Sequence, residues 1–292
     1  MVERYQEDLP PEHIMLSEDV QLSRTDVQTT FVELTLYDAC PLCGSDSFAN
    51  HRTGDCSKYP LYKPTLSPII QWLSCNKCSH IFRNGYYTED ALKVLFDQTH
   101  TTQKVGNDIE IQRIVSSKMV EKVLPYKSSG VWLDIGFGNG SLLFTAQEYG
   151  FQSLGLDLRN NNVEALKKFG IQAVCADMKT INVQPKCSVI SLADVLEHMP
   201  YPVDALKAAH KLLEEDGILF LSMPNCDSTV WKVMDSQNSN PYWGEMEHCH
   251  NFDRATLYAL LIKNGFEPLR YGVSERYRVC MEVVARKVRR PF

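Results

Sequence analysis

Short apolar runs alternate with amphipathic segments between residues 130 and 225. The runs typical of buried strands are VWLDIG (131–136), FQSLGLDL (151–158), IQAVCAD (171–177), CSVISLADVL (187–196) and GILFLSMPN (217–225). Helical spacing of apolar positions is found between them in SLLFTAQEYG (141–150), NNVEALKKFG (161–170) and PVDALKAAHKLLEEDG (202–217). This alternation indicates a parallel sheet that is covered by helices on both faces. We therefore predict an α/β fold with a doubly wound sheet.

The segments on either side of this region complete the predicted organisation. After it, DRATLYALLIKNGF (253–266) is expected to be a helix, and EPLRYGV (267–273) and RVCMEVVARKV (278–288) a closing pair of strands. The mostly parallel sheet would then have seven strands. Three segments precede it: a polar N-terminal arm over 1–36, a small unit rich in Cys, Pro, Gly and Ser over 37–87, and a helical bridge over 88–129. In the bridge, Ile111, Ile114, Val115 and Met119 fall on one helical face.

Composition and charge indicate which broad class of protein this is, but they do not indicate its chemistry. The chain has 292 residues, of which 44% are hydrophobic, as is ordinary for a protein with a buried core. No run approaches the ~20 apolar residues of a membrane span, and the acidic start MVERYQEDLPPEH does not resemble a secretory signal. We therefore expect a cytoplasmic protein without a membrane partner. The net charge of −6 argues against broad nucleic-acid binding.

A strand that ends in three alternate glycines is the first candidate for ligand chemistry. In VWLDIGFGNGSLL (131–143), Gly136, Gly138 and Gly140 follow Asp134 and lead directly into a helix. Because glycine has no Cβ, such a turn lets the backbone approach a nucleotide-like cofactor closely. On its own the turn could equally belong to a dinucleotide site, whose G-x-G-x-x-G differs only in its last spacing.

Further motifs, in the expected order, resemble those of class I S-adenosylmethionine-dependent methyltransferases. In that family an acidic residue at the end of the second strand accepts hydrogen bonds from both ribose hydroxyls, and LGLDL places Asp157 there. CADM supplies Asp177 and Met178 beside the adenine, SLADVLEHMPYP resembles the EHLPDP signature, and LLEEDGILFLSMPN matches the helix–turn–strand that follows. The resemblance implies a Rossmann-like methyltransferase domain over 130–292, with S-adenosylmethionine as its cofactor.

The same resemblance implies a set of cofactor-binding residues. They are Asp134, Gly136, Phe137, Gly138, Gly140, Asp157, Leu158, Asp177, Met178 and Ala193. Asp134 would either orient the glycine turn or contact the ammonium group of the cofactor. Met178 would contribute to packing as much as to adenine contact.

Four cysteines form two C-x-x-C pairs in the small unit. These are Cys40 and Cys43 in CPLCG, and Cys75 and Cys78 in CNKCS. Thiolates at this spacing can close a tetrahedral zinc site, and four protein ligands make such a site structural rather than catalytic. Two redox pairs are the alternative, but the strand–helix context of a thioredoxin-like motif is missing. We expect a structural Zn²⁺ in a zinc-binding unit over 37–87, with Cys56 and His80 as spare candidate ligands.

A cysteine–zinc unit ahead of this core resembles a narrower group of proteins. The group comprises sugar C-methyltransferases and related small-molecule methyltransferases of bacterial surface-polysaccharide and natural-product pathways. The likeness covers residues 37–292, although the second pair reads CNKCS where the group typically has CxxCG. In the sugar enzymes the zinc unit helps to cover the acceptor site, and the likeness implies the same role here.

Two histidines are candidates for handling the acceptor. Methyl transfer is an in-line displacement that often requires removal of one acceptor proton, and the ordinary pKa of histidine suits that task. His248 in GEMEHCHNF matches the position of a basic histidine in the sugar C-methyltransferases, so we predict that it is the base. His198 in LEHMP either takes part in catalysis or only shapes the loop beside the cofactor. His250 is either a hydrogen-bonded polar residue or a metal ligand with His248 and Cys249.

The sequence therefore predicts a methyltransferase whose partner is a small-molecule acceptor, such as a nucleotide-linked sugar or a secondary-metabolite intermediate. Tyr242, Trp243 and Trp231 either wall the acceptor pocket or pack on the sheet edge. The alternative is an RNA methyltransferase acting on ribosomal bases, since some of these enzymes also begin with CPLC. Against it, Tyr59 and Pro60 stand where those enzymes have a histidine, and the chain is acidic.

Overall fold

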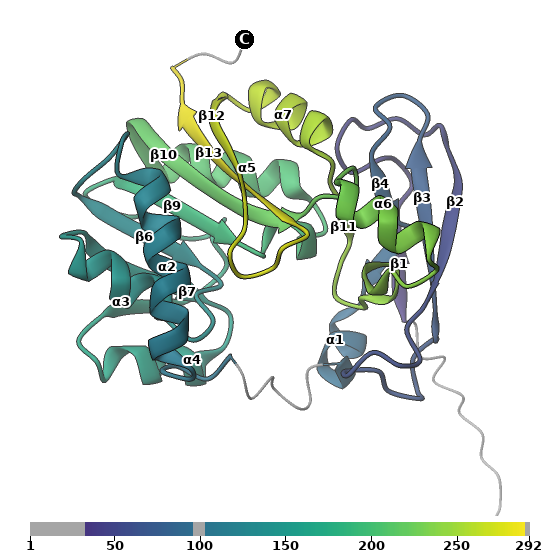
Figure 1. The fold of residues 1–292 in the computed structure, drawn as a ribbon, viewed down its shortest axis with the longest axis horizontal. Coiled ribbons are helices and arrows are strands. Elements are labelled where there is room, and N and C mark those ends of the chain that lie inside the picture. Colours follow the sequence, from purple (N-terminus) through teal and green to yellow (C-terminus); the bar gives the residue numbers. More distant parts are fainter. Residues whose placement is uncertain (1–32, 96–102, 290–292) are drawn as a thin grey trace, which may run out of the picture. The chain divides into compact units, whose positions relative to one another are not determined.

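The computed structural model describes residues 33–95 and 103–289 (Figure 1). Most of the arm expected over 1–36, and part of the bridge expected over 88–129, lie outside the described residues. The described strands form a seven-stranded, a four-stranded and a two-stranded sheet. No helix among the described residues is long and apolar enough to cross a membrane.

The seven-stranded sheet confirms the predicted Rossmann-like fold. Its strands are β6 (Val131–Ile135), β7 (Gln152–Asp157), β8 (Gln172–Cys175), β9 (Cys187–Ala193), β10 (Leu213–Pro224), β12 (Phe266–Val273) and β13 (Cys280–Lys287). They lie in the order β12-β13-β10-β9-β6-β7-β8. The five strands from β10 to β8 are parallel, whereas β13 pairs antiparallel with both β10 and β12.

Alternate residues of the central strands enter two different apolar clusters, which is why both faces of this sheet are covered. Trp132 of β6 and Phe220 of β10 pack with α2 (Ile109–Val123), α3 (Ser141–Glu148) and α4 (Asn160–Lys167). Their neighbours Leu133 and Leu221 pack with α5 (Pro202–Leu212) and α7 (Arg254–Lys263). A strand turns successive side chains to opposite faces, so each apolar run serves both clusters.

Two details differ from the sequence patterns. Ile111 and Ile114 lie on the outer side of α2 and are 68% and 66% exposed, whereas Met119 is fully buried against the sheet. The helix expected over 202–217 ends at Leu212, because β10 begins at the next residue. Leu213 already pairs with β9, and the pairing of the two strands shifts in register between Leu213 and Ile218.

The four-stranded sheet combines the cysteine-rich segment with a strand from the other half of the chain. Its strands are β2 (Phe48–Asp55), β3 (Ile69–Cys75), β4 (Ile81–Arg83) and β11 (His250–Asn251), in the order β11-β4-β3-β2. The two-stranded sheet pairs β1 (Leu34–Leu36) with β5 (Gly85–Tyr87), and α1 (Glu89–Leu95) and α6 (Thr229–Ser236) lie nearby in Figure 1. The segment over 37–87 therefore completes its sheet only with β11.

Gly54 of β2 is where the loop that carries Trp243 approaches this sheet most closely. A Cβ on Gly54 would lie 1.7 Å from the carbonyl oxygen of Trp243, which also accepts a hydrogen bond from Trp72 Nε1 at 2.9 Å. We expect Gly54→Ala to lower the free energy of unfolding by about 1–3 kcal/mol, since backbone must move to admit the methyl group. Urea denaturation measures the change. Gly272→Ala is the control, because its Cβ would meet only the flexible end of Lys122 at 3.6 Å; equal losses in both variants would contradict the prediction.

Candidate active site

The glycine turn connects β6 to α3 and requires glycine for backbone reasons. Gly136, Gly138 and Gly140 have φ values of +66°, +54° and +79°, in the left-handed region that other residues rarely adopt. A Cβ on Gly136 would also lie 2.9 Å from Cγ2 of Val195. Because Gly140 is the N-cap of α3, the turn leads from the strand end straight to the first N–H groups of a helix.

The other residues expected to hold the cofactor follow the ends of neighbouring parallel strands. Asp157 ends β7, Ala193 ends β9, and Asp177 is the second residue after β8. The register of β7 with β8 pairs Asp157 with Cys175, so these two strands end level. Ligands of open α/β sheets bind outside the carboxyl ends of such strands. The topology thus brings these residues to one edge of the sheet, beside the glycine turn.

Asp157 is buried and paired with Arg159, which the sequence analysis did not select. Nε of Arg159 donates to Oδ1 of Asp157 at 2.9 Å, and Nη2 of Arg159 donates to Oδ2 at 2.7 Å. The backbone N–H of Arg159 also donates to Oδ1 at 2.9 Å. Leu158 between them is 76% exposed, whereas Met178 is buried. An ionised carboxylate has about four acceptor positions, of which these donors fill three, so Asp157 has room for one hydroxyl donor, and for a second only if Arg159 gives up a hydrogen bond.

Asp134 lies inside the sheet and is hydrogen-bonded across it. Its Oδ1 accepts from Ser191 Oγ at 2.6 Å, and Ser191 Oγ in turn accepts from Trp132 Nε1 at 2.9 Å. Burial raises the pKa of Asp134 to about 7. These bonds connect β6 to β9 just before the glycine turn, where they hold the two strand ends together.

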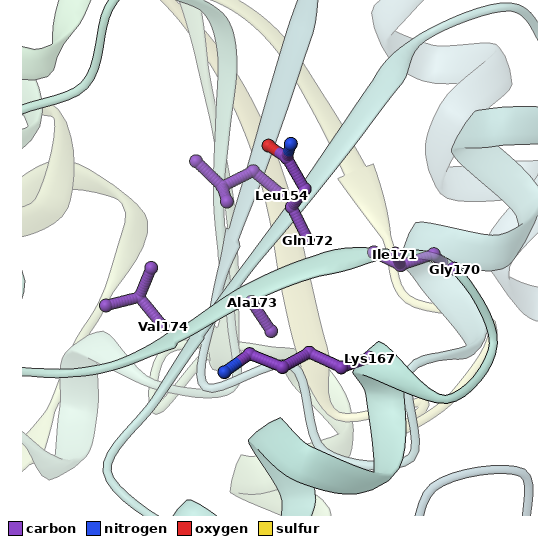
Figure 2. Close-up of a pocket in the computed structure, with 7 residues that line it drawn as sticks. All are labelled: Leu154, Lys167, Gly170, Ile171, Gln172, Ala173 and Val174. Atoms are coloured by element: carbon purple, nitrogen blue, oxygen red, sulfur yellow. The ribbon is translucent and has the colours of Figure 1, made fainter.

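A surface hollow lies at the β8 edge of the same sheet. Figure 2 shows its lining, which comprises Leu154, Lys167, Gly170, Ile171, Gln172, Ala173 and Val174. The lining includes none of the residues expected to bind the cofactor. Cys175, the last residue of β8, is exposed next to this edge.

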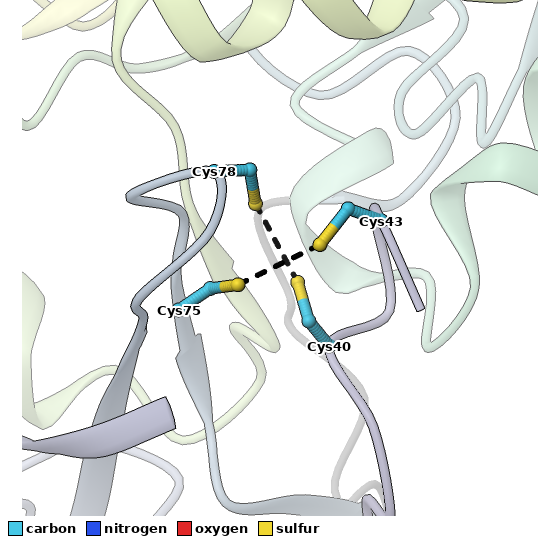
Figure 3. A group of neighbouring side chains, drawn as sticks. All are labelled: Cys40, Cys43, Cys75 and Cys78. Carbon is cyan, nitrogen blue, oxygen red and sulfur yellow. Dashed lines mark hydrogen bonds between the residues drawn. The ribbon is translucent and has the colours of Figure 1, made fainter. Parts of the chain in front are cut away.

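The four cysteines of the C-x-x-C pairs converge on one point (Figure 3). The Sγ atoms of Cys40 and Cys78 are 3.7 Å apart, and those of Cys43 and Cys75 are 3.6 Å apart. Four sulfurs at about 2.3 Å from a tetrahedral zinc ion would be separated by about 3.8 Å, so the donor set fits this ion. Ser79, which stands where the related group has glycine, adopts the left-handed φ of 61° that this turn requires.

Both histidines selected from the sequence lie in a second polar cluster. His198 ends a 3-10 turn after β9 (Leu196–His198), and His248 lies just before β11. Their rings are perpendicular, with centroids 4.7 Å apart. His248 Nε2 is 2.9 Å from Oε2 of Glu245, and His198 Nδ1 is 3.1 Å from the carbonyl oxygen of Glu247. Glu197 is 1% exposed and completes the cluster.

The environment shifts the pKa values of this cluster in different directions. Burial raises the pKa of Glu197 to about 8 and lowers that of His198 to about 4. Burial also acts to lower the pKa of His248, but the charge and hydrogen bond of Glu245 outweigh it and raise the pKa to about 9. Perturbed pKa values concentrate at functional sites, which makes the cluster the candidate acceptor site.

The remaining candidates of this loop point elsewhere. His250 Nδ1 lies 3.0 Å from Nε2 of His80, and His250 Nε2 lies 2.9 Å from the carbonyl oxygen of Met199. His250 is therefore a hydrogen-bonded residue of β11 in the four-stranded sheet, as the first of the two alternatives stated. Trp231 and Trp243 are buried and pack edge to face. Of the two roles considered for these aromatic residues, packing is therefore the one observed for Trp231 and Trp243.

Comparisons with known proteins identify the domain. Residues 110–271, more than half of the chain, match the family described as a methyltransferase domain. The chain belongs to this methyltransferase family. The Rossmann-like sheet and the glycine turn are those of its class I, S-adenosylmethionine-dependent members.

Similar proteins cover only parts of the methyltransferase chain. The ubiquinone biosynthesis O-methyltransferase of Haemophilus ducreyi is 30% identical over 105 residues, 32% of this chain and 44% of that protein. Its mitochondrial counterpart from Candida albicans is 30% identical over 139 residues, 44% of this chain and 40% of that protein. The chain thus spans less than half the length of these curated relatives. The solved structure of the 1,6-didemethyltoxoflavin-N1-methyltransferase of Burkholderia thailandensis shares the fold, with a TM-score of 0.53 and 16% sequence identity. The match covers 73% of this chain and 97% of the Burkholderia chain.

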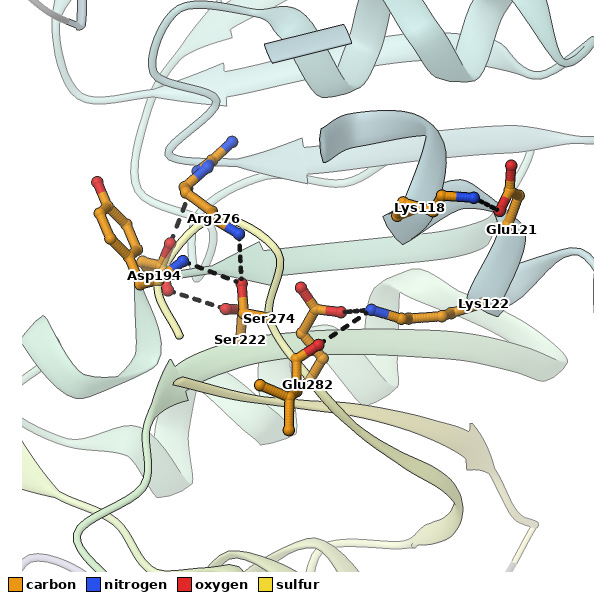
Figure 4. Close-up of polar contacts among 10 residues, drawn as sticks. Lys118, Glu121, Lys122, Asp194, Ser222, Ser274, Arg276 and Glu282 are labelled. Carbon is orange, nitrogen blue, oxygen red and sulfur yellow. Dashed lines mark hydrogen bonds and ion pairs between the residues drawn. The ribbon is translucent and has the colours of Figure 1, made fainter. Parts of the chain in front are cut away.

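Hydrogen bonds and an ion pair connect Asp194, which follows β9 of the methyltransferase domain, to the last hairpin of that domain (Figure 4). Asp194 has φ of 58° and accepts a hydrogen bond from Ser222 Oγ at 2.9 Å. One guanidinium nitrogen of Arg276, from the loop between β12 and β13, lies 3.6 Å from the other carboxylate oxygen of Asp194. Lys122 of α2 pairs with Glu282 on β13, which anchors the base of this hairpin.

Sequence reasoning missed four charged residues of this region: Asp194, Glu197, Glu245 and Arg276. Asp194 and Glu197 stand in the quoted segment SLADVLEHMPYP, and Glu245 in GEMEHCHNF, so both signatures contained them. Their placement after a predicted strand or beside a selected histidine was a usable signal. Nothing in the sequence pattern indicates that Arg276 reaches the end of β9.

Proposed function

We propose that this protein transfers a methyl group from S-adenosylmethionine to a small-molecule acceptor. The observation that carries the proposal is the junction of a glycine turn, an acidic strand end and a buried His–Glu cluster along the carboxyl ends of β6, β7 and β9. The names of the two curated relatives favour a hydroxyl oxygen as the methylated atom. A nucleotide-linked sugar carries such hydroxyls, and the cysteine unit supports that acceptor class. These relatives lend no support to the RNA alternative.

The direct test identifies the product. Protein incubated with S-adenosylmethionine labelled in its methyl group, together with a small-molecule extract of the source cells, should label one or a few low-molecular-weight compounds. Mass spectrometry then locates the methyl group on oxygen or on another atom. Label that appears only in RNA would replace the small-molecule proposal with the alternative.

The donor would lie across the ends of the parallel strands. When bound, the cofactor supplies an electrophilic methyl group on its sulfonium. The glycine turn would accommodate its amino-acid end, with Asp134 holding β6 and β9 together behind it. Asp157 would accept from the ribose hydroxyls, with Met178 and Asp177 beside the adenine.

We expect Asp157→Asn to weaken binding of S-adenosylhomocysteine at least about tenfold, because hydrogen bonds to a charged group contribute about 1.5–3 kcal/mol. Isothermal titration calorimetry measures the affinity. The control is Asp204→Asn, which removes an exposed carboxylate of α5 paired only with Lys207 at 3.6 Å. Thermal unfolding of both variants checks that Arg159, left without its ion pair, does not unfold the domain. Unchanged affinity in Asp157→Asn would exclude this carboxylate from the donor site.

A structural zinc ion is the second part of the proposal. The spacing of the four sulfurs suits it, and the ion would fix the loop after β1 to the turn between β3 and β4. Tyr59, from the stretch between the two cysteine pairs, donates to Oε2 of Glu247 at 2.8 Å. The zinc-binding unit therefore contacts the residue that precedes His248, which supports a role in covering the acceptor site.

Protein purified without chelators should contain about one equivalent of zinc by elemental mass spectrometry, and Cys40→Ser should lose it and unfold at a lower temperature. Cys56→Ser is the matched control: Cys56 is equally buried, but its thiol donates to the carbonyl oxygen of Ser67 at 3.4 Å and lies outside the four-cysteine cluster. Less than about half an equivalent in the wild type, or equal losses in both variants, would count against the zinc site.

His248 would act on the acceptor. Its Nε2 is engaged by Glu245, so the nitrogen available to the acceptor is Nδ1. We expect His248→Ala to lower turnover at least about tenfold while the affinity for the cofactor stays within a factor of ~3, because the imidazole acts on the acceptor and not on the donor. His51→Ala, an exposed histidine of β2, should leave both quantities unchanged. Full turnover in His248→Ala would remove the residue from the reaction.

A further inference from the structure

Glu197, His198 and His248 present three potential ligand atoms to one another at the end of β9. One nitrogen or oxygen atom of each lies within 4.8 Å of the others. Glu197 and His248 are 1% and 6% exposed, and His198 is partly buried. Two imidazoles and one carboxylate that converge from two loops are a donor set for divalent first-row transition metals, and it leaves coordination positions open.

The hydrogen bonds of the two histidines determine which nitrogens remain free. A carbonyl oxygen can only accept, so His198 Nδ1 carries the hydrogen that it donates to Glu247, and the lone pair of a neutral ring is on Nε2. Likewise, His248 Nε2–H donates to the carboxylate of Glu245, so the lone pair of a neutral His248 ring is on Nδ1. A metal-ligating histidine typically donates its other N–H to a carboxylate or a backbone carbonyl, and each of these histidines does so.

Three polar atoms on two residues of this cluster have no hydrogen-bond partner in the described part of the chain. Both carboxylate oxygens of Glu197 and Nδ1 of His248 are buried and accept or donate no hydrogen bond. A buried polar group without a partner lowers stability, and a charged one does so most. The native fold retains these three atoms on Glu197 and His248, and a bound cation would give both residues a partner.

The charges around the cluster also favour a cation. Glu197 interacts electrostatically with the carboxylates of Asp194 and Glu245, and Asp194 has Arg276 as its cationic partner at 3.6 Å. No lysine or arginine pairs with Glu197 or Glu245 among the ion pairs of residues 33–95 and 103–289; Glu245 instead pairs with the imidazole of His248. When His248 is neutral and Glu197 ionised, as metal ligation requires, a divalent ion would offset the negative charge of Glu197 and Glu245.

We propose that Glu197, His198 and His248 bind a divalent metal ion, at a site separate from the four cysteines. The existence of the site does not depend on the function proposed above, but its role does. An acceptor hydroxyl bound at an open coordination position loses its proton more readily, and that proton can pass to water. His248 would then serve as a ligand through Nδ1, and would not itself take the proton.

The test titrates zinc-loaded wild-type protein with Co²⁺ and follows visible absorption. We expect about one equivalent of Co²⁺ beyond zinc, with the weak bands of nitrogen and oxygen ligation and without the intense thiolate-to-cobalt band. Glu197→Gln should weaken Co²⁺ binding at least about tenfold, since even loss of a residue that only orients a ligand costs that much. Glu267→Gln, which removes a carboxylate of β12 paired with Arg286, should not weaken it.

His198→Gln serves as a second variant, because His198 is only partly buried and its loss is less damaging to folding. Binding that is absent from the wild type, or equal in wild type, Glu197→Gln and His198→Gln, would overturn the inference. If Co²⁺ does not bind and His248→Ala still lowers turnover, the base assignment stands and only the metal site fails. If Co²⁺ binds as expected and His248→Ala keeps full turnover, the metal site stands and the proposed acceptor site fails.

Discussion

The backbone of one residue, Cys249, joins the cysteine-rich sheet to the candidate acceptor site. Its N–H donates to the carbonyl oxygen of Glu197 at 2.8 Å, and its carbonyl oxygen accepts from the N–H of Arg83 at 2.9 Å. Glu197 follows β9 of the large sheet, whereas Arg83 belongs to β4 of the small one. His248 precedes Cys249 directly, so its position depends on both sheets at once. Any loss of order in the cysteine-rich unit therefore reaches the acceptor side chains through two hydrogen bonds.

This connection also explains why the two parts of the chain share a core. The cluster that contains Leu133 and Leu221 of the large sheet continues through Phe252 to Phe82 and Leu73 of the small one. His80 and His250 are hydrogen-bonded to each other within this region. The cysteine-rich unit is too small to bury a sufficient core alone, and it compensates by packing on the domain that it helps to complete.

The large sheet and the places of the glycine turn and the acidic strand ends could be predicted from sequence because local patterns determine them. Strand periodicity, the glycine turn and the acidic strand ends each depend on neighbouring residues, and the strands lie where the apolar runs placed them. The exposure of Ile111 and Ile114 and the early end of α5 at Leu212 could not be predicted this way, since packing and strand register decide them. Arg276 reaches Asp194 only through the hairpin of β12 and β13, a contact over about eighty residues of sequence that no local pattern records.

The acceptor cluster has a net charge that the fold must balance, and this constrains its chemistry. With Glu197 ionised and His248 neutral, two carboxylates of the cluster, those of Glu197 and Glu245, lie near each other without a positive partner. A proton on His248 gives Glu245 a partner, but it occupies the lone pair that proton removal or metal ligation requires. A proton on Glu197 relieves the repulsion and leaves the lone pair of His248 Nδ1 still without a hydrogen-bond donor. The proposed cation would instead be bound by the carboxylate of Glu197 and one nitrogen of each histidine, because one ion takes the place of the protons on these three ligands while Glu245 keeps its hydrogen bond from His248.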